Sequence, residues 1–118
     1  MLFNFDILNV DQGRANMSCL QGYVEADYNT LVEVFGEPHY NTPSADEKVN
    51  TEWELRFEVQ EEGEEDTDIV YATIYDWKDY DGGFRSRGGL PYQWHIGGDN
   101  KDAVDAVKQA IKNYMEVN

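Results

Sequence analysis

Hydrophobic and polar residues alternate without a break from Thr51 to Val59. The two sides of this run are Trp53, Leu55, Phe57 and Val59 against Glu52, Glu54, Arg56 and Glu58. Strict alternation with a period of two is typical of a β-strand that has one buried face and one solvated face. Residues 69–77 form a second run that is rich in β-branched and aromatic residues, which strands favour. The two runs therefore predict a long antiparallel hairpin.

The turn of this predicted hairpin is strongly acidic. Its carboxylates surround Gly63 with no basic residue between them, and they are Glu61, Glu62, Glu64, Glu65, Asp66 and Asp68. Alternate side chains on a strand repeat about every 6.6 Å, so the polar side of the first strand and the turn predict a row of regularly spaced negative charges. Such a row can compete with a phosphate backbone for a basic groove on another protein.

Two other segments have the periodicity of amphipathic helices. In the first, at about 28–36, Asp27 or Asn29 can cap the start of the helix and Gly36 suits its end. The second, at about 100–116, is longer. Its apolar stripe comprises Ala103, Val104, Val107, Ala110, Ile111, Tyr114 and Met115.

Shorter patterns predict three further strands. Residues 1–10 read as a short edge strand, residues 17–25 as a strand with a bulge or close backbone approach at Gly22, and residues 92–96 as another strong strand. The polar connector at 39–50 is expected to be irregular, and its His39 is expected to be incidental.

These elements predict an α+β fold in a single domain, 1–118. We expect one antiparallel sheet of about 4–5 strands with both helices packed on one face. The helix face would be lined by Trp53, Leu55, Phe57, Val70, Ala72 and Ile74. The opposite face would hold Tyr71, Tyr75 and Trp77. This aromatic strip is either a minor second core, covered by the N-terminal segment, or a binding surface. The first interpretation is favoured.

Charge is distributed unevenly along the chain. The formal net charge of -15 lies entirely within residues 1–77, because residues 78–118 carry equal numbers of acids and bases. An acidic protein repels nucleic acid and anionic membranes and is steered toward basic partners, although acidity also serves solubility alone. The single cysteine, Cys19, forms no internal disulfide and is expected to be a buried small hydrophobe. The N-terminus does not resemble a signal peptide or a membrane span, so a cytoplasmic protein is expected.

Known catalytic and metal-binding motifs are absent from the sequence. Two histidines and one cysteine predict no metal site, and no cofactor is expected. Asp76, Lys78 and His95 could transfer protons if their strands are neighbours, but an enzyme is the less favoured interpretation.

A glycine-rich segment at 78–90 predicts an exposed, mobile loop that carries Arg85 and Arg87. These arginines could bind a phosphate or carboxylate, or could fold back onto the acidic turn, which is favoured. If they bind a ligand, an anionic metabolite or nucleotide would be enclosed by Trp77, Lys78, Arg85, Arg87 and His95.

Several short motifs carry a resemblance to known proteins. They are Tyr28-x-x-Leu31-Val-x-Val-Phe35-Gly36-Glu37-Pro38, Lys48-Val49, Glu52-Trp53, Ala72-Thr-Ile-Tyr-Asp-Trp-Lys78 and Trp94-x-Ile-Gly-Gly98. As a set, this pattern resembles small functionally uncharacterised proteins encoded by tailed bacteriophages. The helix-then-sheet plan also resembles BamE-like domains in architecture alone, since no lipoprotein signal is present. The phage resemblance implies an accessory protein made inside an infected bacterium, and it assigns no catalytic residue.

The leading hypothesis is therefore a non-enzymatic binding or inhibitory protein whose partner is a basic, nucleic-acid-handling host or defence protein. Its contact residues would be Glu52, Glu54, Glu58, Glu61, Glu62, Glu64, Glu65 and Asp66. Direct binding of nucleic acid or membrane is not expected. The alternatives are a binder of small anions, or an enzyme, at the loop site, and an assembly protein that associates through a sheet edge.

Overall fold

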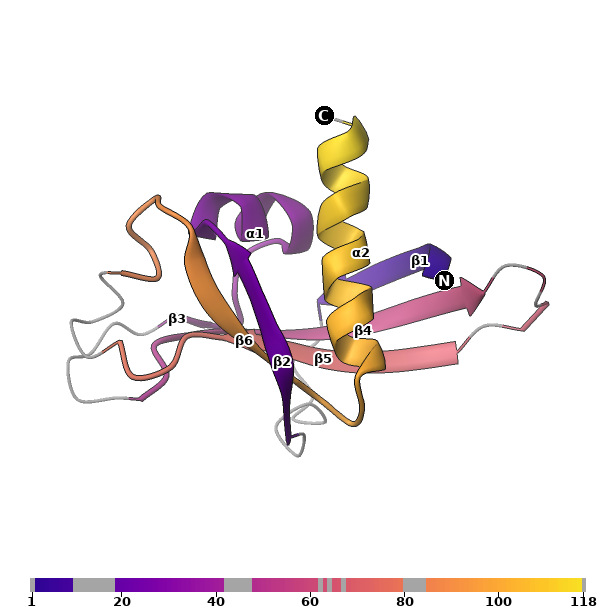
Figure 1. Ribbon diagram of the computed structural model, residues 1–118, viewed down its shortest axis with the longest axis horizontal. Coiled ribbons are helices and arrows are strands. Elements are labelled where there is room, and N and C mark those ends of the chain that lie inside the picture. The colour runs from indigo at the N-terminus through magenta and orange to yellow at the C-terminus, as the bar shows by residue number, and fades with distance from the viewer. Residues whose placement is uncertain are drawn as a thin grey trace.

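The computed structural model describes residues 2–9, 19–41, 48–61, 63, 65–66, 68–79 and 85–117. Its elements follow in the order β1 (Leu2–Asn9), β2 (Cys19–Ala26), α1 (Tyr28–Phe35), β3 (Tyr40–Asn41), β4 (Thr51–Glu61), β5 (Asp68–Tyr75), β6 (Tyr92–Gly98) and α2 (Asp102–Val117). The strands form one antiparallel sheet in the order β1-β4-β5-β6-β2, and the short β3 pairs with the starting end of β4. The predicted α+β fold is thus confirmed (Figure 1).

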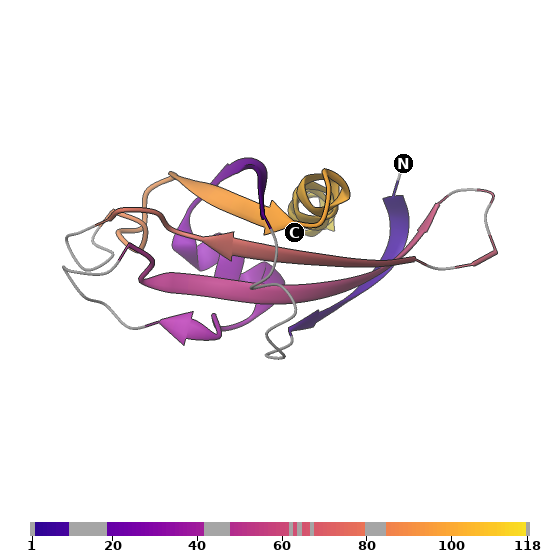
Figure 2. The ribbon, with the colours of Figure 1, turned by 90° about the horizontal axis from the view of Figure 1, so that it is seen from below.

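The predicted hairpin is the centre of this sheet. β4 and β5 pair from Glu52 opposite Tyr75 to Val59 opposite Asp68. Both helices lie on one face of the sheet, and Figure 2 shows α2 nearly end-on against it. The apolar side of β4 is buried beneath the helices, as the alternation predicted, and Ala72 is buried on the same side.

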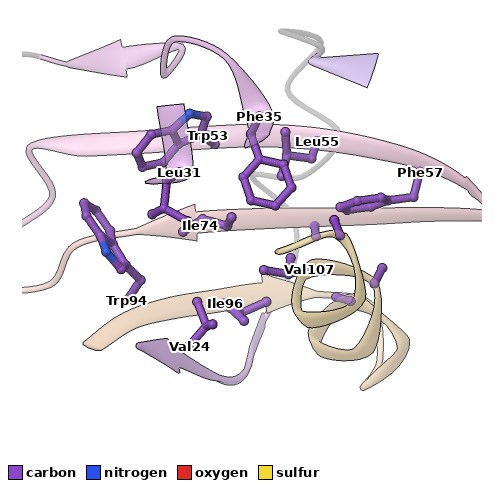
Figure 3. Close-up of a cluster of buried hydrophobic side chains, with 14 of the residues drawn as sticks. Val24, Leu31, Phe35, Trp53, Leu55, Phe57, Ile74, Trp94, Ile96 and Val107 are labelled. Atoms are coloured by element: carbon purple, nitrogen blue, oxygen red, sulfur yellow. The ribbon is translucent and has the colours of Figure 1, made fainter. Parts of the chain in front are cut away.

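The core between the sheet and the helices is aromatic at its centre (Figure 3). The rings of Trp53 and Trp94 meet edge to face at 5.4 Å between centroids. Each indole N–H donates to a backbone carbonyl oxygen, that of Gly36 at 2.7 Å and that of Ala26 at 2.9 Å. Both tryptophans are therefore fully buried without leaving a polar atom unsatisfied.

The helix boundaries follow the predicted capping residues. The Asp27 side chain accepts the N–H of Thr30 at 3.2 Å, and Gly36 ends α1 with a positive φ of 86°. α2 packs closely on β6, because Gly98 has no side chain to separate its backbone from Ala103. The last turns of α2 extend past the sheet (Figure 1), and Met115, predicted in the apolar stripe, is 62% exposed there.

Some local predictions were wrong. Cys19 is exposed, at the start of the edge strand β2. The connector at 39–50 contains β3, and His39 is not incidental, since its Nδ1 accepts the backbone N–H of Glu54 at 3.2 Å. β1 pairs along the edge of β4, and residues 10–18 lie outside the described part of the chain, so cover of the aromatic strip by the N-terminal segment stays a prediction. No helix in the described ranges is long and apolar enough to cross a membrane.

Candidate functional site

The sheet face opposite the helices, called the open face below, carries the polar side of β4. The structure does not present this side as the predicted exposed acidic row. Glu54 is only 4% exposed, and Glu52 is half-buried. Arg56 neutralises part of the remaining negative charge on this side of β4 through an ion pair with Glu58 at 3.0 Å. Alternation of sequence correctly assigned these residues to one face, but it did not reveal how little solvent reaches them.

The turn of the hairpin is exposed where it is described. Glu65 and Asp66 are accessible to solvent, and the backbone of Glu61 ends β4. The predicted contact residues Glu62 and Glu64 lie outside the described residues. The acidic surface predicted from sequence is therefore reduced, in the described part, to the hairpin end and Glu58.

A row of polar and aromatic side chains crosses the open face at the other end of the hairpin. Glu52 pairs with Tyr75, Tyr75 pairs with His95, and His95 pairs with Tyr23, so the row runs directly across β4, β5, β6 and β2. The His95 ring lies 5.4 Å from that of Tyr75 and 4.9 Å from that of Tyr23, between ring centroids. Such cross-strand neighbours are in direct contact on a sheet.

Trp77 extends this row beyond the end of β5. Its ring centroid lies 6.3 Å from that of Tyr75 and 6.1 Å from that of His95. Trp77 is 40% exposed, in contrast to the two buried tryptophans. The aromatic strip predicted for this face is therefore present, and part of it is open to solvent.

Two lysines lie at this exposed indole. The Nζ atom of Lys48 is 6.0 Å and that of Lys78 is 5.8 Å from the centroid of the Trp77 ring, which is the range of cation–π contact. Lys78 has a positive φ of 56°, a left-handed conformation that is uncommon for a residue with a side chain. We call Lys48, Trp77, Lys78 and His95 the lysine–indole corner.

A buried carboxylate holds the backbone beneath this corner. Asp76 is fully buried, and its Oδ1 accepts the N–H groups of Asn50 at 2.7 Å and Thr51 at 3.0 Å. Its Oδ2 accepts the hydroxyl of Ser86 at 3.1 Å. Asp76, which the sequence suggested as a proton-transfer group with Lys78 and His95, is thus engaged in holding three segments together.

The same contacts constrain the loop that was predicted to be exposed and mobile. Ser86 is fully buried, and its N–H donates to Asp79 Oδ2 at 2.8 Å. Arg85 is exposed and Arg87 is partly buried on either side of it. Burial raises the pKa of Tyr92, and the charges of Asp76 and Asp79 add to this effect. The hydrogen bond that Tyr92 accepts from the N–H of Trp77 at 3.3 Å and the nearby positive charge of Arg85 oppose it. Arg85 therefore lies beside the corner, and the loop at this point is anchored.

Burial and neighbouring charge alter proton affinities along the row. Burial, together with the charges of Glu54 and Asp76, raises the pKa of Glu52 from an ordinary 4.5 to about 7. Burial also raises the pKa of Tyr75, to which the charge of Glu52 adds. The pKa of His95 is lowered by burial, against the opposing effect of Asp76. At neutral pH the row is consequently less charged than its residue types suggest.

Two buried polar atoms on the open face have no hydrogen-bond partner within the described part of the chain. They are Oε2 of Glu54 and Nδ1 of His95. Buried polar atoms are nearly always hydrogen-bonded, and an unsatisfied one costs roughly 1–3 kcal/mol. These atoms are therefore the places on this face where a bound molecule would gain most from a polar contact.

A separate hollow of about 250 Å³ lies at the start of α2. Its lining includes Asp68, Asp99 and Asp102, so it is unsuited to an anion. Among the residues with described positions, no three His, Cys, Asp or Glu side chains are placed to hold a metal ion. The lysine–indole corner is therefore the candidate site.

Sequence reasoning included Trp77, Lys78, Arg85, Arg87 and His95 in one site, and the structure brings Trp77, Lys78 and His95 together. It missed Lys48 and Tyr23. Lys48 required knowledge that the chain before β4 is hydrogen-bonded to the chain after β5, through the N–H of Lys78 and the carbonyl oxygen of Lys48. Tyr23 required knowledge that β2 lies beside β6.

Comparison with known proteins found no match: no family model, curated protein or solved structure matches the chain.

Proposed function

We propose that this protein is a binding protein that recognises a small anionic ligand at the lysine–indole corner. The observation that carries the proposal is the placement of two ammonium groups over one exposed indole ring in a protein of net charge -15. Within the described ranges, neither Lys48 nor Lys78 forms an ion pair with a carboxylate, so both ammonium groups can interact with an anion.

The chemistry of the corner suits a ligand that is both planar and anionic. An indole face binds planar groups by stacking, and ammonium groups donate charge-assisted hydrogen bonds to phosphate or carboxylate oxygens. Arg85 adds a further positive charge beside the corner. The cost of bringing two like charges near one ring is offset when an anion lies between them.

The net charge limits the size of the ligand. A polyanion such as nucleic acid would place many charges against the acidic remainder of the protein, which repels it. A small anion is screened from distant carboxylates, because the Debye length is about 8 Å at physiological salt. The corner is therefore suited to small anions and not to a nucleic-acid strand.

Tryptophan fluorescence tests this proposal directly. Trp53 and Trp94 are fully buried, so quenching by the neutral molecule acrylamide reports mainly on Trp77. Orthophosphate, benzoate and AMP, titrated to millimolar concentration, should include at least one compound that protects Trp77 from quenching. In the double variant Lys48→Gln/Lys78→Gly, the Kd for the protecting compound should rise about tenfold. The matched control Lys108→Gln/Lys112→Gln removes the same charge from α2 and should retain it.

If none of these compounds protects Trp77, or if the α2 control loses protection equally, the proposal is wrong. A circular dichroism spectrum identical to that of the wild type would show that the corner variant is folded.

A second candidate function is the recognition of a basic partner protein by the hairpin end. It is favoured by the exposure of Glu65 and Asp66 in the turn and of Asp68 at the start of β5. Figure 1 shows that this end of the hairpin extends past α2. In this role the chain would be an acidic accessory protein, of the phage type that its motifs resemble, acting on a nucleic-acid-handling host or defence protein. Charge reversal of Glu61, Glu62, Glu64 and Glu65 should abolish capture of that partner from bacterial lysate. Reversal of Asp102 and Asp105 on α2 should not, and equal loss in both variants would contradict the hairpin as the contact.

A further inference from the structure

The open face changes in chemical character from the lysine–indole corner toward the middle of β4. Trp77 and its lysines lie at one end, followed by Tyr75 and His95, then Glu52 across from Tyr75, and then Glu54 two residues further along β4. Adjacent strands lie about 4.8 Å apart, so Glu52 and His95 flank Tyr75 within about 10 Å of one another. A cation, an aromatic surface and a carboxyl group thus follow one another on a single face.

The glutamate side chains at the β4 end of this row have unused hydrogen-bonding capacity. Glu54 is almost fully buried, with only 4% of its surface exposed, and its Oε2 meets no donor in the described residues. Glu52 lies on the same side of β4 and nearer to the solvent. A carboxylate oxygen accepts only, so both groups select a ligand atom that bears hydrogen.

The carboxyl group of Glu52 has a second property. Because its pKa is about 7, it is present at neutral pH in both its protonated and its ionised form. Only the ionised form distinguishes an amino group from a keto oxygen, because a carboxylate accepts and does not donate, whereas a protonated carboxyl can also donate to a keto oxygen.

We propose that the anionic ligand is a mononucleotide whose base carries an exocyclic amino group, with its phosphate at Lys48 and Lys78, its base against Trp77 and Tyr75, and its amino group directed to Glu52. This inference rests on the proposed function, since it assumes that a small anion binds at the corner. Carboxylate side chains accept from the amino group of cytosine in other recognition systems, and a keto oxygen in the same place would face an acceptor. Discrimination of this kind is strong, because the wrong base leaves a buried polar group unpaired.

Pairs of nucleotides that differ at one exocyclic group provide the test. CMP and AMP carry an amino group where UMP and IMP carry a keto oxygen, while the phosphate and sugar are unchanged. Isothermal titration calorimetry at pH 8.5, where Glu52 is mostly ionised, should give a Kd for CMP at least tenfold below that for UMP, and a similar ratio for AMP over IMP, or for one of the two pairs. Glu52→Gln should reduce the ratio to about twofold, because an amide also donates to a keto oxygen. Glu58→Gln, further along the same side of β4, should leave the ratio unchanged.

The outcomes separate the two proposals. Equal affinity for amino and keto members of both pairs, with binding still dependent on Lys48 and Lys78, would overturn the assignment of Glu52 while the anion-binding function stands. A ratio that survives Glu52→Gln would also overturn it. If no nucleotide, orthophosphate or benzoate protects Trp77 in the quenching experiment, both proposals fail together.

Discussion

Lys78 donates its backbone N–H to the carbonyl oxygen of Lys48 at 2.7 Å. The two residues are far apart in sequence, and this hydrogen bond closes the sheet at the base of the β4–β5 hairpin. It is formed with Lys78 in the left-handed backbone conformation, at φ 56°. The result is that both ammonium groups lie over the ring of Trp77. Backbone strain of this kind is often found where a side chain is held for binding.

Replacement of Lys78 by glycine should separate stability from binding. Glycine relieves a left-handed conformation that costs about 1–2 kcal/mol, and adds unfolded-state entropy worth about 0.4–1 kcal/mol. We expect Lys78→Gly to leave the free energy of unfolding within about 1 kcal/mol of the wild type or slightly above it, and to weaken anion binding about threefold, because Lys48 remains. Urea denaturation and fluorescence titration measure the two effects.

The control for this variant is Lys112→Gly in α2. A glycine inside a helix costs about 1 kcal/mol, and this position is remote from Trp77. It should lower stability and leave binding unchanged, which is the opposite pattern. A large loss of stability in Lys78→Gly would mean that the lysine side chain, and not the hydrogen bond of its backbone, holds the hairpin end.

Stability should depend on the ionisation of Glu52. Its folded-state pKa of about 7 lies above the ordinary 4.5, so the folded protein binds this proton more tightly than the unfolded chain does. The resulting stabilisation is fully present below about pH 4.5 and is lost as the pH rises through 7. Glu52→Gln imitates the protonated form. We expect it to be more stable than the wild type by about 1–2 kcal/mol at pH 8, after allowance for solvent screening, and equally stable at pH 4.5.

The comparison of the two proteins across this pH range by urea denaturation isolates Glu52 from the other carboxylates, which both proteins share. A stability difference that is constant from pH 4.5 to pH 8 would show that the carboxyl group titrates normally.

Asp76 should be among the residues most sensitive to substitution. It is fully buried and accepts from Asn50, Thr51 and Ser86. Asp76→Ala removes the acceptor of these three buried hydrogen bonds, and we expect a loss of about 2–4 kcal/mol. Asp76→Asn retains one oxygen for the two backbone N–H groups and should cost less, about 1–2 kcal/mol. Thermal unfolding gives the order, and an alanine variant as stable as the asparagine variant would contradict it.

Two glycines should differ in their tolerance of a methyl group. A Cβ at Gly98 would collide with the Cβ of Ala103 and approach the carbonyl oxygen of Tyr71 at 3.1 Å, both of which are fixed. A Cβ at Gly22 would meet Cγ2 of Val104 at 2.9 Å, and that side chain can rotate. We expect Gly98→Ala to cost about 2–3 kcal/mol and Gly22→Ala to cost about 1 kcal/mol, measured by urea denaturation. The reverse order would indicate that α2 can shift away from β6.

The sequence by itself determined most of the architecture. The alternation from Thr51 to Val59 and the periodicity of the two helices specified which side chains enter the core, because burial of apolar area dominates the stability of such elements. Asp27 and Gly36 determined the ends of α1 through local hydrogen bonding and backbone freedom, which need no tertiary contact.

The candidate site was decided by the tertiary structure. Lys48 and Lys78 meet only through the register of the hairpin, which depends on the geometry of a long turn that composition does not specify. His95 and Tyr23 join Tyr75 only through the order of the strands in the sheet. Glu54 is buried although its pattern predicted a solvated face, because alternation reports the direction in which a side chain points and not how much of the surrounding protein covers it. The exposure of Glu54 and the pKa of Glu52 both depend on the side chains packed around them in the folded sheet, and not on residue type alone.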